Sequence, residues 1–126
     1  MTLREKQSAF ILCVAKLIIK AYELGYELTI GEAFRTADQQ SLYFEGYTLL
    51  KIGSELKLAA SAKKSKTMNS RHMQKLAIDL NLFINGEYRS DKEAYKELAK
   101  YWKGLHPDNV SGYDWGWDFN HFEMKP

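Results

Sequence analysis

The sequence offers little material for several common kinds of site. Its one cysteine, Cys13, excludes an internal disulfide and a zinc site built from thiolates. A net charge of +2 does not by itself indicate a nucleic-acid partner. The apolar stretch from Ala9 to Ile19 is interrupted by Lys16, is too short to span a bilayer and is followed by no cleavage site. We therefore expect synthesis in the cytoplasm without a signal peptide, and no stable membrane insertion.

Apolar and aromatic residues, in contrast, are plentiful. Hydrophobic residues make up 45% of the 126 positions, with 8 Tyr, 6 Phe and 3 Trp. Such a chain can bury a core without disulfides and does not have the composition of a disordered segment. Its length fits one domain over residues 1–126, without repeats or linkers. Cys13 lies in an apolar run, so we place its thiol in the core.

Capping signals divide the chain into elements. Three capping boxes mark helix starts: Thr2-x-x-Glu5, Thr36-x-x-Gln39 and Ser90-x-x-Glu93. Asn85-Gly86 is a strong hairpin signal. We expect helices over residues 2–24, 36–53 and 91–104, strands over residues 27–34, 76–84, 87–88 and 118–124, and a loop over residues 54–69. The predicted fold is α+β, with a small, mostly antiparallel sheet packed by about three helices.

The first helix has apolar residues at helical spacing, which predicts a buried face. That face contains Phe10, Ile11, Val14, Ala15, Ile18, Ile19 and Tyr22.

The run from Ser70 to Ile84 carries the first candidate site residues. Leu76, Ile78 and the apolar residues at alternate positions after them predict one buried strand face. Asp79 lies on the opposite face, and His72 stands just before the strand. A loop histidine and an exposed strand acid are the simplest interpretation of each residue alone. However, aspartate is disfavoured inside strands, and a bound metal ion would explain its presence.

A second group lies near the end of the chain, in DFNHFEM. Asp118 precedes His121 by three residues, and Glu123 shares the strand face of His121. Two histidines and one aspartate can form a zinc site with an open position. Asp118 could serve as a proton acceptor for a zinc-bound water if a bend turns it towards His121. Glu123 is either a partner of a ligand histidine or a surface acid.

Three other features remain open at this point. His106 precedes a proline in a polar turn, and we do not count it among the ligands. Arg35, between a predicted strand and helix, suits recognition of a carboxylate or carbonyl, although a structural ion pair is the default for such a residue. The basic segment over residues 51–75 contains Glu55 as its only acid, so it is either a solvated loop or a surface for an anionic polymer or a membrane.

Three blocks resemble the zinc D-alanyl-D-alanine carboxypeptidase family, which includes the phage L-alanyl-D-glutamate endopeptidases that act as endolysins. The blocks, in the order of that family, are Phe34-Arg35-Thr36 with Gln40 and Leu42-Tyr43, then Ser70-x-His72-x-x-x-x-Ala77-x-Asp79-Leu80, then Asp118-x-x-His121. They cover most of the chain. The resemblance implies the D-Ala-D-Ala-peptidase fold, also called hedgehog-like, and a Zn²⁺ cofactor.

The resemblance also implies roles. His72, Asp79 and His121 would bind zinc, and Asp118 would be the general base and acid. Arg35 would bind substrate and polarise the scissile carbonyl. Ser70 and Gln40 would contact the peptide, with Glu123 behind the metal ligands. The substrate would be a peptidoglycan stem peptide.

An aspartate at the base position looks more like the phage endopeptidases than the resistance-type dipeptidases. The resemblance then implies cleavage of the L-Ala–D-Glu bond by a phage-type lysis enzyme. We expect a monomer that acts on the cell wall after holin-type release. The chain departs from the family in having Lys75 where a glycine is usual. We also expect no wall-binding module, although one is common in endolysins of Gram-positive hosts. Other functions remain open: a D-Ala-D-Ala carboxypeptidase, or a non-catalytic zinc-containing cell-wall binding module. We do not expect nucleic acid as a partner.

Overall fold

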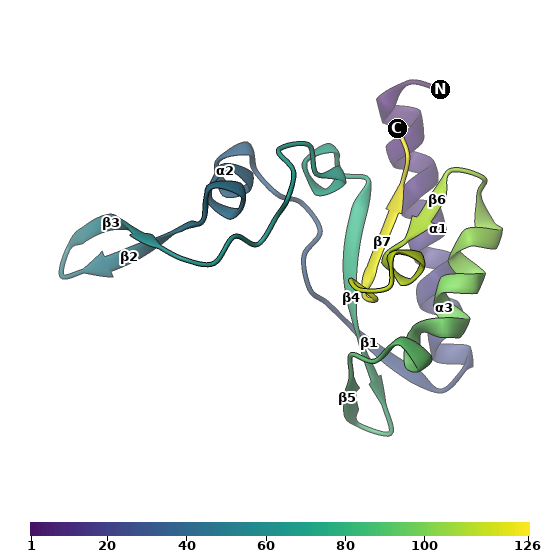
Figure 1. Ribbon diagram of the computed structural model, residues 1–126. Coiled ribbons are helices and arrows are strands. Elements are labelled where there is room, and N and C mark those ends of the chain that lie inside the picture. The colour runs from purple at the N-terminus through teal and green to yellow at the C-terminus, as the bar shows by residue number, and fades with distance from the viewer.

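The computed structural model describes residues 1–126 and has the expected α+β architecture (Figure 1). Its three α-helices are α1 (Leu3–Glu23), α2 (Ala37–Glu45) and α3 (Lys92–Leu105). Its strands are β1 (Tyr26–Ile30), β2 (Tyr47–Ile52), β3 (Glu55–Ala60), β4 (Ala77–Ile84), β5 (Glu87–Arg89), β6 (Asn109–Ser111) and β7 (His121–Met124). Two short 3₁₀ helices, η1 (Arg71–Gln74) and η2 (Gly112–Trp115), precede β4 and β7. No helix combines the length and apolar character needed to cross a membrane.

Strand β4 organises the main sheet, which is antiparallel throughout. One edge of β4 pairs with β1, from Ile30↔Leu80 to Tyr26↔Ile84. Its other edge pairs with β7 at its start and with β5 at its end, and β6 pairs with β7. The predicted alternation is confirmed, because Leu76, Ile78, Leu80 and Leu82 are buried. The hairpin at Asn85-Gly86 is also present, with Asn85 in the left-handed conformation that such turns need.

Helices α1 and α3 cover one face of this sheet, as Figure 1 shows, and form the core with it. Trp102 of α3 is fully buried and meets Phe10 of α1 and Phe122 of β7 edge-on, with ring centroids 5.7 Å apart in each pair. Cys13 lies in this core, as predicted.

The buried face of α1 is rotated from the one we predicted. Ile11, Ile19 and Tyr22 are exposed, whereas Leu17 and Ala21 are fully buried. The buried stripe runs through Phe10, Cys13, Val14, Leu17 and Ala21 at steps of three or four residues. The sequence has apolar residues on two overlapping stripes, and contact with α3 selects one of them.

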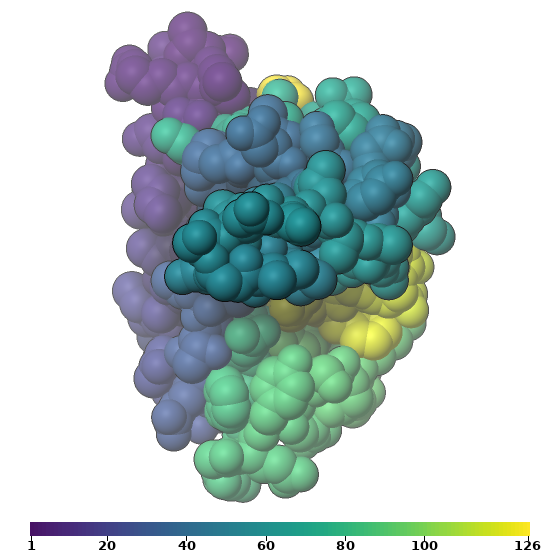
Figure 2. All heavy atoms as spheres, turned by 90° about the vertical axis from the view of Figure 1, so that its left-hand side faces the viewer, coloured from purple at the N-terminus to yellow at the C-terminus, as the bar shows by residue number.

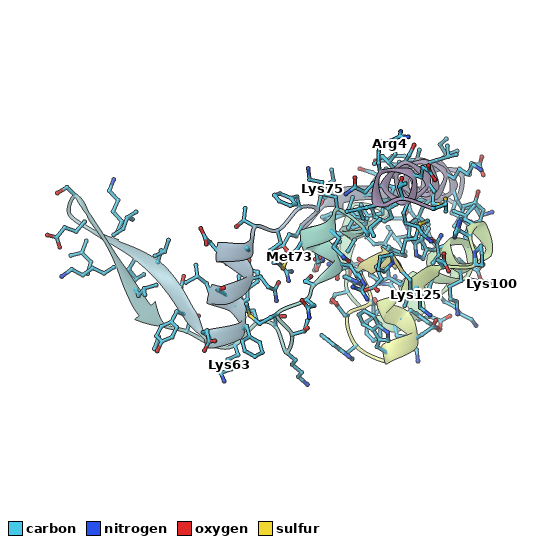
Figure 3. The ribbon with its side chains drawn as sticks, turned by 90° about the horizontal axis from the view of Figure 1, so that it is seen from above. Arg4, Lys63, Met73, Lys75, Lys100 and Lys125 are labelled. Atoms are coloured by element: carbon cyan, nitrogen blue, oxygen red, sulfur yellow. The ribbon has the colours of Figure 1, made fainter.

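The predicted helix over residues 36–53 and the predicted loop over residues 54–69 are both partly wrong. Helix α2 ends at Glu45 because Gly46 takes a left-handed conformation, with φ of 82°, and caps the helix. Beyond it, β2 and β3 pair from Tyr47↔Ala60 to Ile52↔Glu55 as a separate two-stranded sheet. This hairpin projects away from the body of the protein in Figures 1 and 3.

Smaller differences affect the other boundaries. The first strand ends at Ile30, and α3 begins at Lys92 with Asp91 rather than Ser90 as its N-cap. Strand β6 was not predicted. The last strand begins at His121 rather than at Asp118, which matters for the site.

Candidate metal centre and cleft

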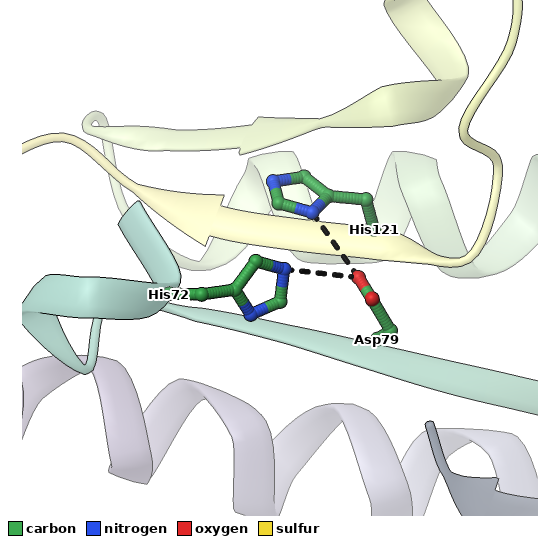
Figure 4. A group of neighbouring side chains, drawn as sticks. All are labelled: His72, Asp79 and His121. Atoms are coloured by element: carbon green, nitrogen blue, oxygen red, sulfur yellow. Dashed lines mark hydrogen bonds and ion pairs between the residues drawn. The ribbon is translucent and has the colours of Figure 1, made fainter. Parts of the chain in front are cut away.

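Pairing of β4 with β7 brings the two candidate segments together. Asp79 and His121 are direct partners across the antiparallel pair, so their side chains emerge side by side on one face. His72 comes from η1, whose N-cap is Ser70, with the Ser70 Oγ accepting a hydrogen bond from the His72 backbone N–H. Figure 4 shows both imidazole rings turned towards the Asp79 carboxylate.

These three side chains could hold a metal ion. Asp79 Oδ1 lies 3.3 Å from His72 Nε2 and 3.2 Å from His121 Nδ1. One potential ligand atom from each residue lies within 4.8 Å of the others, and both histidines are buried. Two imidazole nitrogens and one carboxylate oxygen form a donor set that suits zinc and leaves room for a fourth ligand.

The outward nitrogens of the histidines favour the same interpretation. His72 Nδ1 lies 3.0 Å from the carbonyl oxygen of Ala33, which can only accept, so this nitrogen carries the proton and donates it. His121 Nε2 lies 2.8 Å from Glu123 Oε1 and donates to that carboxylate. Partners of this kind fix ring orientation in metal sites and direct the other nitrogen towards the ion.

Without an ion, the Asp79 carboxylate and the His121 imidazole each stabilise the charged form of the other. Burial works to raise the pKa of Asp79, but hydrogen bonds with His121 and His72 outweigh it and hold that pKa at about 2. Burial works to lower the pKa of His121, but the hydrogen bonds with Asp79 and Glu123 outweigh it and raise that pKa to about 9. A proton on His121 thus occupies the place that a cation would take.

Asp118 lies beside this group on a bend that ends at His121. The His121 backbone N–H donates to the Asp118 carbonyl oxygen over 3.1 Å, so the chain turns just before β7 begins. The bend places Asp118 Oδ2 3.7 Å from His121 Nδ1. Burial, as the largest influence, raises the pKa of Asp118 above its ordinary value. A carboxylate with a raised pKa near a metal centre suits proton transfer.

Arg35 approaches the centre from the loop between β1 and α2. Its Nη1 donates to Gln40 Oε1 over 2.7 Å and to Ser70 Oγ over 3.2 Å, and its Nε pairs with Glu32. The guanidinium also stands over the ring of Tyr43, 4.9 Å from its centroid. These contacts fix the guanidinium on one side of the centre.

Gln40 takes a different place from the one expected for a substrate contact. It is fully buried and does not line the cleft. Its amide nitrogen donates to Ser65 Oγ over 2.8 Å and to the Thr67 carbonyl oxygen, while its amide oxygen holds Arg35. Gln40 therefore joins Arg35 to the 61–69 loop. His106 lies apart in the turn after α3, where its Nδ1 accepts from the backbone N–H of Asp108.

A cleft of about 570 Å³ opens over these side chains. Its wall contains seven of the eight predicted site residues, all except Gln40: Arg35, Ser70, His72, Asp79, Asp118, His121 and Glu123. The rest is mostly basic and aromatic, and includes Lys63, Lys64, Lys66, Arg71, Trp115 and Trp117. In Figure 2 the blue residues of α2 and the teal residues of the β2–β3 hairpin stand in front, and yellow C-terminal residues show beneath them.

The fold is similar to that of a solved L-Ala D-Glu endopeptidase. This is the ChiX enzyme of Serratia marcescens, matched with a TM-score of 0.56 at 19% sequence identity. The match covers 78% of this chain and 66% of that chain, so the chain spans slightly less than two thirds of the enzyme. No protein-family model and no curated protein matches the sequence. At this level of identity the likeness concerns the fold.

Sequence reasoning missed the aromatic wall of the cleft. The Trp115 ring lies 5.1 Å from the His121 ring at an interplanar angle of 34°, and 6.1 Å from that of Trp117. The YDWGWD turn was visible in the sequence, but only the packing of η2 against β7 shows that it faces the site. The basic wall was visible as a lysine-rich segment, without an indication of which lysines line a cleft.

Proposed function

We propose that this protein is a zinc-dependent peptidase that hydrolyses a bond in the stem peptide of bacterial peptidoglycan, the L-Ala–D-Glu bond being the first candidate. The observation that carries the proposal is the His72–Asp79–His121 group on the floor of a cleft, with Asp118 beside it. The similarity in fold to an L-Ala D-Glu endopeptidase supports the choice of substrate.

The donor set fits zinc, and each side chain around it has a distinct task. When bound, zinc would supply a Lewis acid and lower the pKa of a coordinated water to about 7. Asp118 accepts the proton of the attacking water and later passes it to the leaving amine. Arg35, held by Gln40 and Glu32, donates to the scissile carbonyl oxygen as negative charge develops there. Ser70, which already accepts from Arg35, is placed to contact the peptide backbone.

The charges along the cleft support an anionic substrate. Three lysines and two arginines line it, whereas the acidic residues in its wall are Asp79, Asp118 and Glu123. Asp79 and Glu123 are already engaged by histidines. A stem peptide carries free carboxylates, so its attraction to this wall would favour binding.

The test is digestion of purified peptidoglycan followed by mass analysis of the products. We expect new L-Ala carboxyl ends and D-Glu amino ends, which disappear when a zinc chelator is added and return when zinc is restored. Protein with Asp79→Ala, which removes the shared ligand, serves as the metal-site control. Release of free D-Ala would instead identify a D-Ala-D-Ala carboxypeptidase.

Unchanged peptidoglycan from folded, zinc-loaded protein would contradict the proposal and favour a non-catalytic wall-binding module. A pull-down with intact peptidoglycan would then distinguish binding from no interaction.

We further propose that the protein is a phage-type lysis enzyme that reaches the cell wall through a holin. This proposal is supported by the aspartate, rather than glutamate, at position 118. Co-expression with a holin in bacteria should cause lysis, whereas expression alone should not. Equal lysis in both cultures would contradict holin dependence.

A further inference from the structure

The hairpin of β2 and β3 carries large apolar side chains that nothing in the protein covers. Hereafter "the hairpin" means residues 47–60. Five aliphatic side chains on it are between 48% and 69% exposed: Leu49, Leu50, Ile52, Leu56 and Leu58. A two-stranded hairpin is at best marginally stable alone in water, and an exposed apolar one is prone to aggregation. Such a surface indicates a partner.

These side chains occupy both faces of the hairpin. Residues paired directly across two antiparallel strands point to the same side. Leu49 pairs with Leu58, and Leu56 with Lys51, so these share one face. Leu50 pairs with Lys57, and Ile52 with Glu55, which places Leu50 and Ile52 on the other face. A protein groove that receives one face would leave the other in water, whereas immersion in a lipid interface covers both at once.

Charge gives the second indication. The hairpin contains two lysines, Lys51 and Lys57, and one acid, Glu55, a net charge of +1, and the lysine-rich cleft wall of residues 63–66 follows it. Glu55 is partly neutralised by Lys57, whose Nζ lies 3.5 Å from its carboxylate. Lys51 and Lys57 alternate with the aliphatic residues. Their stems can lie along an apolar layer while their ammonium groups reach anionic headgroups.

The base of the hairpin is tied to the end of α2, so the hairpin can act as a positioned arm. The Ser61 backbone N–H donates to the Gly46 carbonyl oxygen over 2.9 Å, and that of Lys64 to the Tyr43 carbonyl oxygen over 3.0 Å. Six strand residues reach about 20 Å, and interfacial segments bury their apolar side chains about 5–10 Å into the headgroup boundary. The outer half of the hairpin can therefore enter that boundary while the body stays outside.

We propose that the hairpin is a docking element for the surface of a membrane rich in anionic lipids. It inserts its outer aliphatic side chains at headgroup depth, with Lys51 and Lys57 at the lipid phosphates. It does not cross the hydrocarbon layer, because the outer backbone groups of its two strands need water or headgroups as partners. The inference is independent of the peptidase chemistry. Figure 3 shows the hairpin standing clear of the body, as such docking requires.

The test is flotation of the full chain with two kinds of vesicle, one of phosphatidylcholine alone and one with phosphatidylglycerol in equal parts. We expect flotation with the anionic vesicles and little with the neutral ones, and a decrease when salt is added. No flotation with anionic vesicles would overturn the proposal. Equal flotation with both kinds would overturn the role of the lysines.

The aliphatic residues are tested with Leu50→Ser/Ile52→Ser/Leu56→Ser. The matched control is Ile11→Ser/Ile19→Ser, because these two residues of α1 are similarly exposed. We expect at least about a tenfold fall in vesicle partition for the hairpin variant and no change for the control. Full binding by the hairpin variant would overturn insertion of the aliphatic side chains. Binding would then depend on charge alone, and a soluble polyanion such as polyglutamate would compete with the vesicles.

The lysines are tested with Lys51→Gln/Lys57→Gln against Lys96→Gln/Lys100→Gln on α3. Each lysine near an anionic leaflet contributes about fivefold, so loss of the first pair should weaken partition about twenty-five-fold. Both substitutions lie on exposed positions, and circular dichroism verifies the fold. Sedimentation of the wild type without vesicles completes the test. A stable dimer that the serine variant abolishes would assign the hairpin to a second copy of the chain instead.

Discussion

At the scale of single residues, Asp118 lies beside the His72–Asp79–His121 group that could hold a metal ion. Its carboxylate is 3.7 Å from His121 Nδ1, and burial raises its pKa. We expect Asp118→Asn to keep the fold and the zinc stoichiometry but to lower kcat by about a hundredfold or more, because the amide cannot accept the proton of water. Peptidoglycan digestion and metal analysis of the same sample measure both quantities.

The matched control is Asp114→Asn. Asp114 lies on η2 close in sequence, but its carboxylate pairs with Lys103 and does not line the cleft. Near wild-type rates from Asp118→Asn would remove Asp118 from the mechanism, whereas equal losses in both variants would indicate a structural effect on η2.

Lys75 stands at the position where the family that the sequence resembles usually has glycine. It takes the left-handed conformation, with φ of 58°, at the end of η1. Glycine adopts this conformation without steric cost, so the turn has the shape that a glycine would give it. We expect Lys75→Gly to raise the free energy of unfolding by up to about 1 kcal/mol, measured by chemical denaturation.

Lys75→Ala is the control for this substitution. It also removes the ammonium that stands 5.1 Å from the centroid of the Phe34 ring, but it keeps the steric cost of a Cβ. The Lys75→Gly protein should therefore have a higher free energy of unfolding than the Lys75→Ala protein. The reverse order would show that η1 does not hold Lys75 in the left-handed region.

His121 links metal binding to pH. Its pKa of about 9 in the metal-free protein, sustained against burial by Asp79 and Glu123, means that it is protonated at neutral pH. A metal ion must displace this proton, so binding should release protons and apparent affinity should rise with pH up to about 9. Calorimetric titration with zinc in buffers of different ionisation enthalpy measures the number released.

The metal-free protein provides the complementary check. Because folding raises the pKa of His121 above its usual value near 6.5, the ion pairs of His121 stabilise the fold fully below that pH and progressively less as the pH rises through 9. Metal binding without proton release would show that His121 is neutral in the free protein.

At the scale of elements, the bend that carries Asp118 depends on η2. Gly112 begins η2, and a Cβ at this position would overlap the backbone carbonyl of Asp118. We expect Gly112→Ala to displace the bend and lower activity by about tenfold or more, since small misplacements of catalytic groups are costly. Zinc binding should persist if Asp118 moves while His72, Asp79 and His121 keep their positions.

Gly104→Ala is the matched control, because a Cβ there meets nothing within 4 Å. Zinc stoichiometry, activity and thermal stability are compared for both variants. Full activity in Gly112→Ala would mean that the bend relaxes freely and that its packing on η2 is dispensable.

Local signals predicted those elements whose patterns have one dominant interpretation. The alternation around Ile78 and Leu80 fits a strand only, and Thr2 with Glu5 forms the full capping box that was expected. The secondary-structure prediction for the segment after Gly46 was wrong for a physical reason. Leu49, Leu50 and Ile52 fit either a helix or a strand, and no core selects between them, because the hairpin lies outside the main sheet.

The site was predictable as a set of residue types and not as an arrangement. Asp79 stood out because aspartate is disfavoured inside strands, and His72 and His121 stood out because two histidines with one aspartate can form a zinc site. Their meeting depends on the Asp79↔His121 register, which two distant segments settle only by pairing. The buried position of Gln40 and the cleft wall at Trp115 likewise follow from packing between elements.

At the scale of the whole molecule, the cleft brings a basic loop from one part of the fold to an acidic centre from another. Lys63, Lys64 and Lys66 follow the hairpin, whereas Asp79 and Asp118 belong to the main sheet and the bend before β7. A substrate that spans the cleft meets both walls. Its free carboxylates would lie near the ammonium groups and its scissile bond near Asp118.

This arrangement predicts a preference for stem peptides with free carboxylates over peptides whose carboxylates are amidated. Each exposed ammonium–carboxylate pair contributes at most about 1 kcal/mol, so we expect Lys63→Gln/Lys64→Gln/Lys66→Gln to raise KM about tenfold for the free acid with little change in kcat. The amidated peptide should show a smaller increase. Lys96→Gln/Lys100→Gln on α3 keeps the change of charge away from the cleft and should leave both KM values unchanged. Equal KM values of the wild type for the free acid and the amide would show that these lysines do not bind the carboxylates of the substrate.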